Sequence, residues 1–330
     1  MTSILKDQIN LKPLSSTTYS ASWHLDWALG KTLIGGCVAA QIHHAAATHL
    51  SRDPALVARN QPDILNLHIE FLYPCEHYES IISVKSVRIG AATSVLELRL
   101  DQKGKTRVIA FATSTNFDKV IGPSAETAWS LEHPPPPRPD FDRILASQPD
   151  EHWLAGRLAG EVIPLTSRLI GMSPRRGYTV AGICDAWNGF VGAERMDGTY
   201  LAMMADMIPS MSDTLQRSGL YDAHAFLDKK KRWDQQHPGS HTILSNTVAE
   251  AMQSSTFNVT AVMDLRFKQR LPEDGQRWIF TRTSAKMLKD GRMNVDITLC
   301  NENMELLCEA HQLILVLEAQ RKFNRAKSTL

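Results

Sequence analysis

Two polar residues stand in strongly apolar surroundings and are candidates for chemistry. Asp206 ends the apolar run at residues 201–206, and Gln312 lies in the apolar stretch 306–317. A carboxylate removed from water is costly unless it is paired or hydrogen-bonded, and a buried amide must find partners. A carboxylate in such a place can accept a proton from water, so Asp206 is predicted to be a catalytic base. The alternative is an exposed Asp near the end of its helix, where the helix dipole disfavours a negative charge.

Thr260 is a third candidate, a hydroxyl at the start of a predicted strand. If the strand alternates strictly, Thr260 shares a face with Asn258, Val262, Asp264 and Arg266. Such a polar face could simply be solvated. Taken alone, Thr260 is therefore a weak signal.

Cys37 and the pair His43-His44 lie on the first of two predicted helices. A thiol at a helix N-terminus has a lowered pKa and can act as a nucleophile. No motif pairs Cys37 with a base, however, and packing in the core is favoured. The histidine pair occupies roughly the position that Asp206 has in the second helix and could line the same cleft. A histidine pair that is exposed or already satisfied is the other interpretation.

The elements that carry these residues occur twice. In each copy, a glycine-led apolar helix is followed by four runs with the pattern of strands. The first copy has a helix from Gly35-Gly36 to residue 50 and strands over 64–72, 80–89, 94–100 and 107–117. The second has a helix from Asp197-Gly198 to Pro209 and strands over 258–267, 277–288, 293–300 and 306–317. Chance similarity is the alternative, but the matching order and spacing argue against it.

This repeat predicts an α+β fold in which a helix packs on an antiparallel sheet, twice over, with the two sheets joined. The predicted boundaries are an N-terminal domain over 1–125, a proline-rich linker over 126–165 and a C-terminal domain over 166–330. The linker contains four successive prolines, which favour extended geometry. An insertion is expected at about 210–255, since the second helix and its first strand are farther apart than in the first copy.

Bulk composition narrows the class of protein. The chain has 330 residues, 43% of them hydrophobic, and a formal net charge of +1, so a folded protein without a nucleic-acid partner is expected. The five cysteines have no metal-site spacing, and neither a metal nor another cofactor is indicated. The N-terminus lacks a signal core and no stretch is apolar enough for a membrane helix, so a cytoplasmic location is expected. The terminal Ser328-Thr329-Leu330 only distantly resembles a peroxisomal signal.

The two copies and the three polar residues resemble the acyl-CoA thioesterase II family of double hotdog proteins, including its thioesterase-like relatives in fungi. The apolar run ending in Asp206 matches the family's second helix. Thr260 precedes Phe267 by the family's interval, and residues 308–312 match its small-residue run ending in Gln312. The resemblance implies that Asp206, Thr260 and Gln312 together hold a water molecule that attacks a thioester.

This chemistry also needs groups that stabilise the negative charge developing on the thioester carbonyl oxygen. Main-chain N–H groups at a helix N-terminus can bind the carbonyl oxygen of the substrate. Gly36 and Cys37, or Gly198 and Thr199, are the expected donors, and His44 is a further substrate-binding candidate. Flanking residues differ from the family pattern, as does the insertion after Asp206, which could form a lid over the acyl pocket.

Three functions follow as hypotheses. The first is hydrolysis of acyl thioesters of coenzyme A or of an acyl carrier protein, in fatty-acid or polyketide metabolism. The second is a non-hydrolytic cyclase, dehydratase or isomerase that acts on a polyketide or terpenoid-like intermediate in secondary metabolism, with Asp206 as acid or base. The third is a binding or scaffold protein, because fold does not fix function. The sequence leaves a homodimer open.

Overall fold

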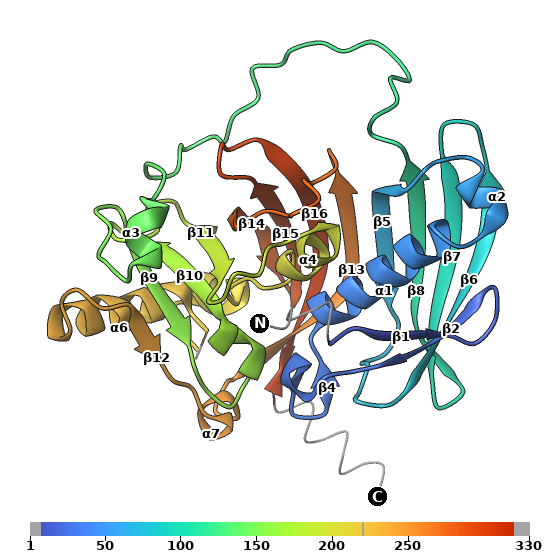
Figure 1. The fold of residues 1–330 in the computed structure, drawn as a ribbon. Coiled ribbons are helices and arrows are strands. Elements are labelled where there is room, and N and C mark those ends of the chain that lie inside the picture. Colours follow the sequence, from blue (N-terminus) through green and yellow to red (C-terminus); the bar gives the residue numbers. More distant parts are fainter. Residues whose placement is uncertain (1–7, 220, 320–330) are drawn as a thin grey trace, which may run out of the picture.

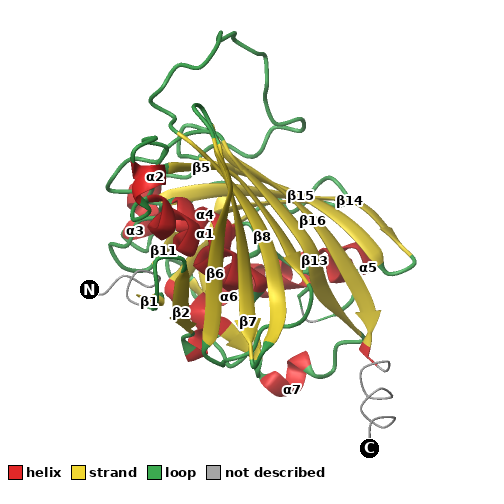
Figure 2. Cartoon of the chain, turned by 90° about the vertical axis from the view of Figure 1, so that its right-hand side faces the viewer, coloured by secondary structure: helices red, strands yellow, loops and turns green. Residues whose placement is uncertain are grey.

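The protein is built on one continuous sheet with its two central helices packed on the same face (Figure 1). The computed structural model describes residues 8–219 and 221–319. The sheet has 14 strands in the order β1-β2-β6-β7-β8-β5-β13-β16-β15-β14-β11-β10-β9-β12. It curves around the helices, as Figure 2 shows. The predicted α+β architecture of two helix-on-sheet copies that share one sheet is confirmed.

The strands of the first half of the chain surround helix α1. The elements of this half are β1 (Asn10–Pro13), β2 (Thr18–Ser22), β3 (Ala28–Leu29), β4 (Thr32–Leu33), α1 (Gly35–Leu50), α2 (Pro54–Val57), β5 (Asp63–Phe71), β6 (Ser80–Ile89), β7 (Ser94–Gln102) and β8 (Lys105–Thr115). β3 and β4 pair with each other in a separate two-stranded sheet. α1 presents Val38, Ile42 and Ala45 to the buried core at helical spacing. Burying a side chain such as Ile42 contributes about 1.5–3 kcal/mol.

The second half repeats this order. It consists of β10 (Leu169–Pro174), β11 (Ile183–Phe190), α4 (Gly198–Met204), β13 (Thr256–Phe267), β14 (Trp278–Lys289), β15 (Arg292–Cys300) and β16 (Leu306–Glu318). Strands β5 and β13 pair antiparallel at the centre, so the strand order of one half mirrors that of the other. Each half also begins with a hairpin, β1–β2 or β10–β11, which the sequence patterns did not reveal.

The repeat extends to irregularities of the strands. Register shifts leave Leu65 as an extra residue in β5 and Ala261 as an extra residue in β13, at matching positions. A second pair of shifts occurs at Val87 in β6 and at Lys286 in β14. A bulge bends its strand and redirects the neighbouring side chains. Agreement at this level excludes chance as the origin of the repeat.

The segment predicted to be a linker contains regular structure. Within 126–165 lie α3 (Phe141–Leu145) and β9 (Trp153–Leu158), and β9 is hydrogen-bonded to β10. α3 covers a second core on the face of the sheet opposite α4, where Phe141 stacks on Trp278 at a centroid distance of 5.0 Å. Buried Arg282 pairs with Asp185 at 2.7 Å and also donates to the carbonyl oxygens of Glu132 and His133, which fixes the start of the proline run.

The predicted insertion forms a structured extension of the second half. It contains α5 (Met211–Gln216), α6 (Ala223–Gln236), β12 (Thr242–Leu244) and α7 (Val248–Ala251). β12 pairs parallel with β9 and so lengthens the sheet. In α6, the buried Lys230 donates to the carbonyl oxygen of Gly171 at 2.9 Å and to Ser173 at 3.0 Å. Burial lowers the pKa of Lys230 to about 8.

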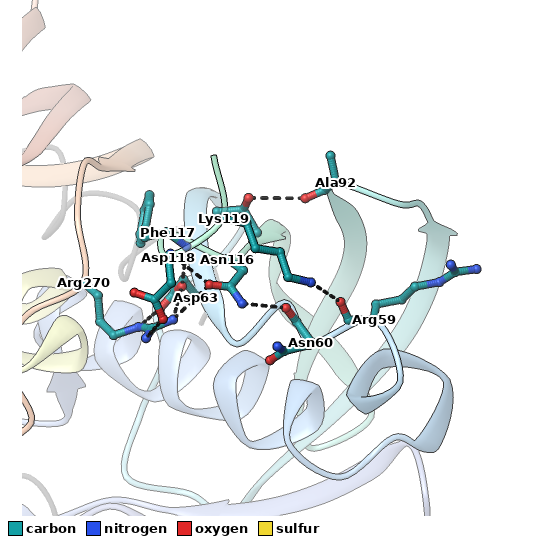
Figure 3. Close-up of polar contacts among 10 residues, drawn as sticks. Arg59, Asn60, Asp63, Ala92, Asn116, Phe117, Asp118, Lys119 and Arg270 are labelled. Atoms are coloured by element: carbon teal, nitrogen blue, oxygen red, sulfur yellow. Dashed lines mark hydrogen bonds and ion pairs between the residues drawn. The ribbon is translucent and has the colours of Figure 1, made fainter. Parts of the chain in front are cut away.

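A polar cluster joins the two halves at one end of the β5–β13 seam (Figure 3). Arg270, just after β13, donates two hydrogen bonds of 2.7 Å to the carboxylate of Asp63 at the start of β5. The same guanidinium also contacts Asp118 and donates to Asn116 at 3.3 Å. Because Asn116 and Asp118 follow β8, this cluster ties the exit of the first half to the second half.

Among the described residues, none of the helices has the length and apolar character needed to cross a membrane. The first seven residues and the C-terminal tripeptide Ser328-Thr329-Leu330, on which the expectations about targeting signals depend, lie outside the described residues.

Candidate active site

Asp206 lies where the C-terminal end of α4 meets the N-terminal end of α1. α4 ends at Met204, so Asp206 is not inside the helix as predicted but in the turn after it, and its N–H donates to the carbonyl oxygen of Met203 at 3.0 Å. The N–H of Gly36 donates to Asp206 Oδ2 at 2.7 Å. A carboxylate at the N-terminus of a helix is favoured by the helix dipole. α1 thus compensates for the unfavourable end of α4.

Two glycines allow this close approach. A Cβ atom on Gly36 would lie 2.5 Å from the carbonyl oxygen of Met203 and 2.8 Å from Asp206 Cβ. A Cβ atom on Gly35 would lie 3.0 Å from Asp206 Oδ2. Gly35-Gly36 therefore lets the two helix ends meet.

Gln312 reaches Asp206 from β16. Its Nε2 donates to the carbonyl oxygen of Ala205 at 2.9 Å and to Asp206 Oδ1 at 3.2 Å. Since both partners are acceptors, the orientation of the amide is fixed by its contacts. The side chain is 2% exposed, and its Oε1 is buried with no hydrogen-bond partner among the described residues. An acceptor in this position needs a donor from a water molecule or a ligand.

Thr260 lies beside this pair because β13 contains a bulge. The register shifts between Thr260 and Val262, so strict alternation fails at Ala261 and Thr260 does not share the outward face of Asp264. The Thr260 side chain instead forms a hydrogen bond that lowers the pKa of Asp206. Asn258, two residues earlier, is likewise bonded to Ser210 and Ser212 on the helix side of the sheet. The interpretation of a solvated face is therefore wrong for Thr260, whereas Asn258 is exposed to solvent.

Burial has the largest effect on the pKa of Asp206. Desolvation raises its pKa above the usual range of an aspartate, while hydrogen bonds from Gly36, Gln312 and Thr260 act in the opposite direction. A carboxylate with a raised pKa is a stronger base, and the hydrogen bonds keep its charged form available.

The first half of the chain has a position that matches Asp206, but it lacks the set of polar groups formed by Asp206, Thr260 and Gln312. Asp206 follows the first residue of α4 by eight positions and His43 follows the first residue of α1 by eight. By the bulges and the strand register, Thr260 corresponds to Ile64 and Gln312 to Ala112. Two of the three polar groups are thus replaced by apolar side chains, so the repeat carries one candidate active site.

His43 is a neutral histidine in that matching position. Its Nδ1 lies 3.1 Å from Thr199 Oγ1, and its ring lies 3.1 Å from where a Cβ atom on Gly198 would be. Burial lowers the pKa of His43 to about 4. Gly198 and Thr199 therefore face His43 at the other end of α4, about 10 Å from Asp206 along the helix. His44 is next to His43 on α1 and is partly buried.

Three of the four predicted oxyanion donors already have acceptors within the chain. The Gly36 N–H donates to Asp206, the Cys37 N–H donates to the carbonyl oxygen of Ile34 at 3.1 Å, and the Thr199 N–H donates to Asp197 at 2.9 Å. The pKa of the Cys37 thiol is raised, chiefly by burial and further by the charge of Asp206. This is opposite to what a nucleophilic thiolate requires. Within the described ranges, no three histidine, cysteine or acidic side chains are grouped so that they could hold a metal ion.

Two family models match most of this chain. Residues 23–115 match the acyl-CoA thioesterase N-terminal domain, and residues 133–316 match the acyl-CoA thioesterase C-terminal domain. A curated relative, the thioesterase-like protein TwmA of Talaromyces wortmannii, is 23% identical over 337 residues, which cover 96% of this chain and 93% of the relative.

Solved structures share the fold over nearly the whole chain. Acyl-CoA thioesterase II TesB2 of Mycobacterium marinum has a TM-score of 0.62 and 16% identity, over 95% of this chain and 97% of that one. A hotdog-fold protein of Alicyclobacillus acidocaldarius has a TM-score of 0.68 and 15% identity, over 96% of this chain and 99% of that one. The double hotdog architecture is thereby confirmed.

Proposed function

The chain belongs to the acyl-CoA thioesterase family and hydrolyses thioesters, and we propose that Asp206, Gln312 and Thr260 hold the attacking water in this reaction. The observation that carries this assignment is the buried Oε1 of Gln312, which has no donor among the described residues and belongs to the same amide group that bonds to Asp206. A water molecule that donates one hydrogen to Asp206 and the other to Gln312 satisfies both groups.

The proposed reaction needs no covalent acyl-enzyme. With both hydrogens of the water engaged, a lone pair of its oxygen is directed at the thioester carbon. As the C–O bond forms, Asp206 accepts a proton from the water. The C–S bond then breaks, and Asp206 returns the proton to the sulfur. The products are a carboxylic acid and a free thiol, and the carboxylate of Asp206 is regenerated.

Each neighbour of Asp206 has a part in this proposal. The N–H of Gly36 and the hydroxyl of Thr260 donate to the carboxylate, which limits the rise of its pKa and fixes its orientation. Nε2 of Gln312 does the same from β16 while its Oε1 remains for the water. These residues come from both halves of the chain, so the joined sheet assembles the site.

The proposed substrates are acyl thioesters of coenzyme A or of an acyl carrier protein, with the acyl group drawn from fatty-acid or polyketide metabolism. A direct test is a single turnover in isotopically labelled water with excess enzyme. The proposal requires one labelled oxygen in the released acid and no acyl adduct on the intact protein by mass spectrometry. A transient adduct would contradict direct attack by water. Conversion of a thioester without thiol release would instead favour a cyclase, dehydratase or isomerase.

A further inference from the structure

Three cations and two aromatic rings form a cluster at one end of the first half of the sheet. We call it the basic rim; it comprises Tyr73, Tyr78, Lys103, Lys105 and Arg107. Lys103 Nζ lies 3.2 Å from the centroid of the Tyr78 ring, and Lys105 Nζ lies 3.3 Å from that of Tyr73. The Arg107 guanidinium is 6.0 Å from the Tyr73 ring. Such contacts hold cations in place without neutralising their charge.

A buried glutamine makes the basic rim one rigid unit. Tyr73 and Tyr78 lie in the loop between β5 and β6, whereas the cations lie in and after the turn between β7 and β8. Gln102, which is 1% exposed, accepts from the N–H of Glu76 at 3.0 Å and donates to its carbonyl oxygen at 2.7 Å. Loop and turn are therefore locked together, and the positions of the charges are preorganised.

The basic rim lies next to the chain that enters α1. The N–H of Leu33 donates to the carbonyl oxygen of Cys75 at 2.8 Å, and Thr32 pairs with Glu76. Gly36, which binds Asp206, is three residues after Leu33, and three residues of extended chain span at most about 11 Å. The chain that leads to Gly36 is therefore bonded directly to the loop that carries the tyrosines of the basic rim.

The cations of the basic rim have no carboxylate partner in the part of the chain that the structure describes. Among the described residues, no ion pair involves Lys103, Lys105 or Arg107, although Glu76 and Glu79 belong to the neighbouring loop. The Nε atom of Arg107 is buried and has no hydrogen-bond partner there. Both lysines are exposed to solvent. Cations held in this way are available to an anionic ligand.

The second half differs from the first at the turn that matches the one carrying Lys103 and Lys105. There, Met196 pairs with Gln276 just before α4, as Thr32 pairs with Glu76 before α1. The matching turn between β15 and β16, residues 301–305, carries Glu302 and Glu305 in place of lysines. Lysines held over tyrosine rings thus belong to the turn of the first half.

We propose that the basic rim binds the phosphate groups of the nucleotide end of a coenzyme A thioester while the thioester lies at Asp206. This inference rests on the proposed function, since it extends the same substrate away from the catalytic water. Lys103 and Lys105 contact phosphate oxygens as point charges, and Arg107 supplies a planar donor group. The tyrosine rings hold the cations in place and offer an apolar surface to the adenine ring of coenzyme A.

The test compares three thioesters of one acyl group, carried on coenzyme A, on phosphopantetheine and on pantetheine, with the variant K103E/K105E. For the coenzyme A substrate, KM should rise about tenfold or more at unchanged kcat. The rise should be smaller for phosphopantetheine, and pantetheine should show none. The control K85E/K289E makes the same change of charge at exposed lysines on other strands and should behave as wild type.

Calorimetric titration with free coenzyme A separates this inference from the reaction itself. The inference requires weaker binding to K103E/K105E than to wild type and to K85E/K289E, whether or not any thioester is hydrolysed. Equal binding to all three proteins would overturn it, as would an equal loss on the pantetheine substrate. If K103E/K105E lost activity only on a thioester carried by an acyl carrier protein, the inference would also be overturned. The basic rim would then be assigned to binding of the carrier protein.

Discussion

The main-chain N–H of Gly36 donates a hydrogen bond of 2.7 Å to the carboxylate of Asp206, a residue 170 positions later in the chain. The bond joins the N-terminal end of one helix to the C-terminal end of its repeat. It also explains how a carboxylate is tolerated in an apolar setting, because a helix N-terminus stabilises negative charge.

Replacing Gly36 with alanine should damage both stability and turnover. The added Cβ would lie 2.5 Å from the carbonyl oxygen of Met203, so the two helix ends must separate. Overpacking of this kind costs about 1–3 kcal/mol in free energy of unfolding, measurable by urea titration. Gly122→Ala is the matched control, since nothing lies within 4 Å of a Cβ atom there. Equal stability of the two variants would contradict the close contact.

Replacing Gln312 with leucine should shift the pH dependence of kcat. The change removes a donor to Asp206, and that hydrogen bond lowers the pKa of the carboxyl group. Because the reaction needs the ionised carboxylate, the acidic limb of the pH–rate profile should move to higher pH. kcat at its plateau should also fall by about two orders of magnitude, since a water-positioning group is lost. An unchanged acidic limb would show that Gln312 does not act on Asp206.

Thr260 should tolerate serine but not valine. Valine keeps the shape and removes the hydroxyl, so the carboxylate loses a donor, whereas serine retains it. We expect kcat to fall by about tenfold or more in Thr260→Val and to stay within a few-fold of wild type in Thr260→Ser. The comparison uses steady-state thiol release. If Thr260→Val and Thr260→Ser were equally active, the Thr260 hydroxyl would have no part in the reaction.

Protonation of His43 should lower the free energy of unfolding of the protein in mild acid. Its pKa is about 4 in the folded state against a usual value near 6.5, so protonation favours the unfolded chain. Its stabilising contribution is present above about pH 6.5 and is lost as the pH falls toward about 4, at a total cost of about 3 kcal/mol. Urea unfolding at several pH values should show a weaker pH dependence for His43→Gln than for wild type. The same slope in both would rule out His43 as the source.

The periodic elements could be predicted from sequence, and the irregular ones could not. Apolar spacing revealed α1 and four strands in each half, because these elements bury one regular face. The hairpins β1–β2 and β10–β11 escaped notice, as did the bulge at Ala261, which depends on pairing with β16. Strict alternation of side chains along a strand without a bulge would place Thr260 on the outward face of the sheet, and this is what the sequence pattern indicated. Likewise, Pro209 suggested a longer α4, whereas the helix ends at Met204 where it meets α1.

The candidate site was predicted in its residue types but not in its contacts. Asp206 and Gln312 stood out because charge and amide groups are rare in apolar runs. The hydrogen bond between Gly36 and Asp206 depends on the packing of α1 on α4, which no local sequence pattern shows. The basic rim was missed for the same reason, since Tyr73 and Lys105 meet only through sheet pairing.

The central claim is that Asp206 accepts the proton of the attacking water, and Asp206→Asn tests it most directly. Burial raises the pKa of Asp206, so its charged form costs stability once the pH exceeds its folded-state pKa. The neutral variant should therefore unfold at an equal or higher temperature than wild type at neutral pH. Its rate of thiol release from acyl-CoA and acyl-pantetheine should nevertheless fall by about two orders of magnitude or more. A folded variant that hydrolyses these thioesters at the wild-type rate would contradict the account.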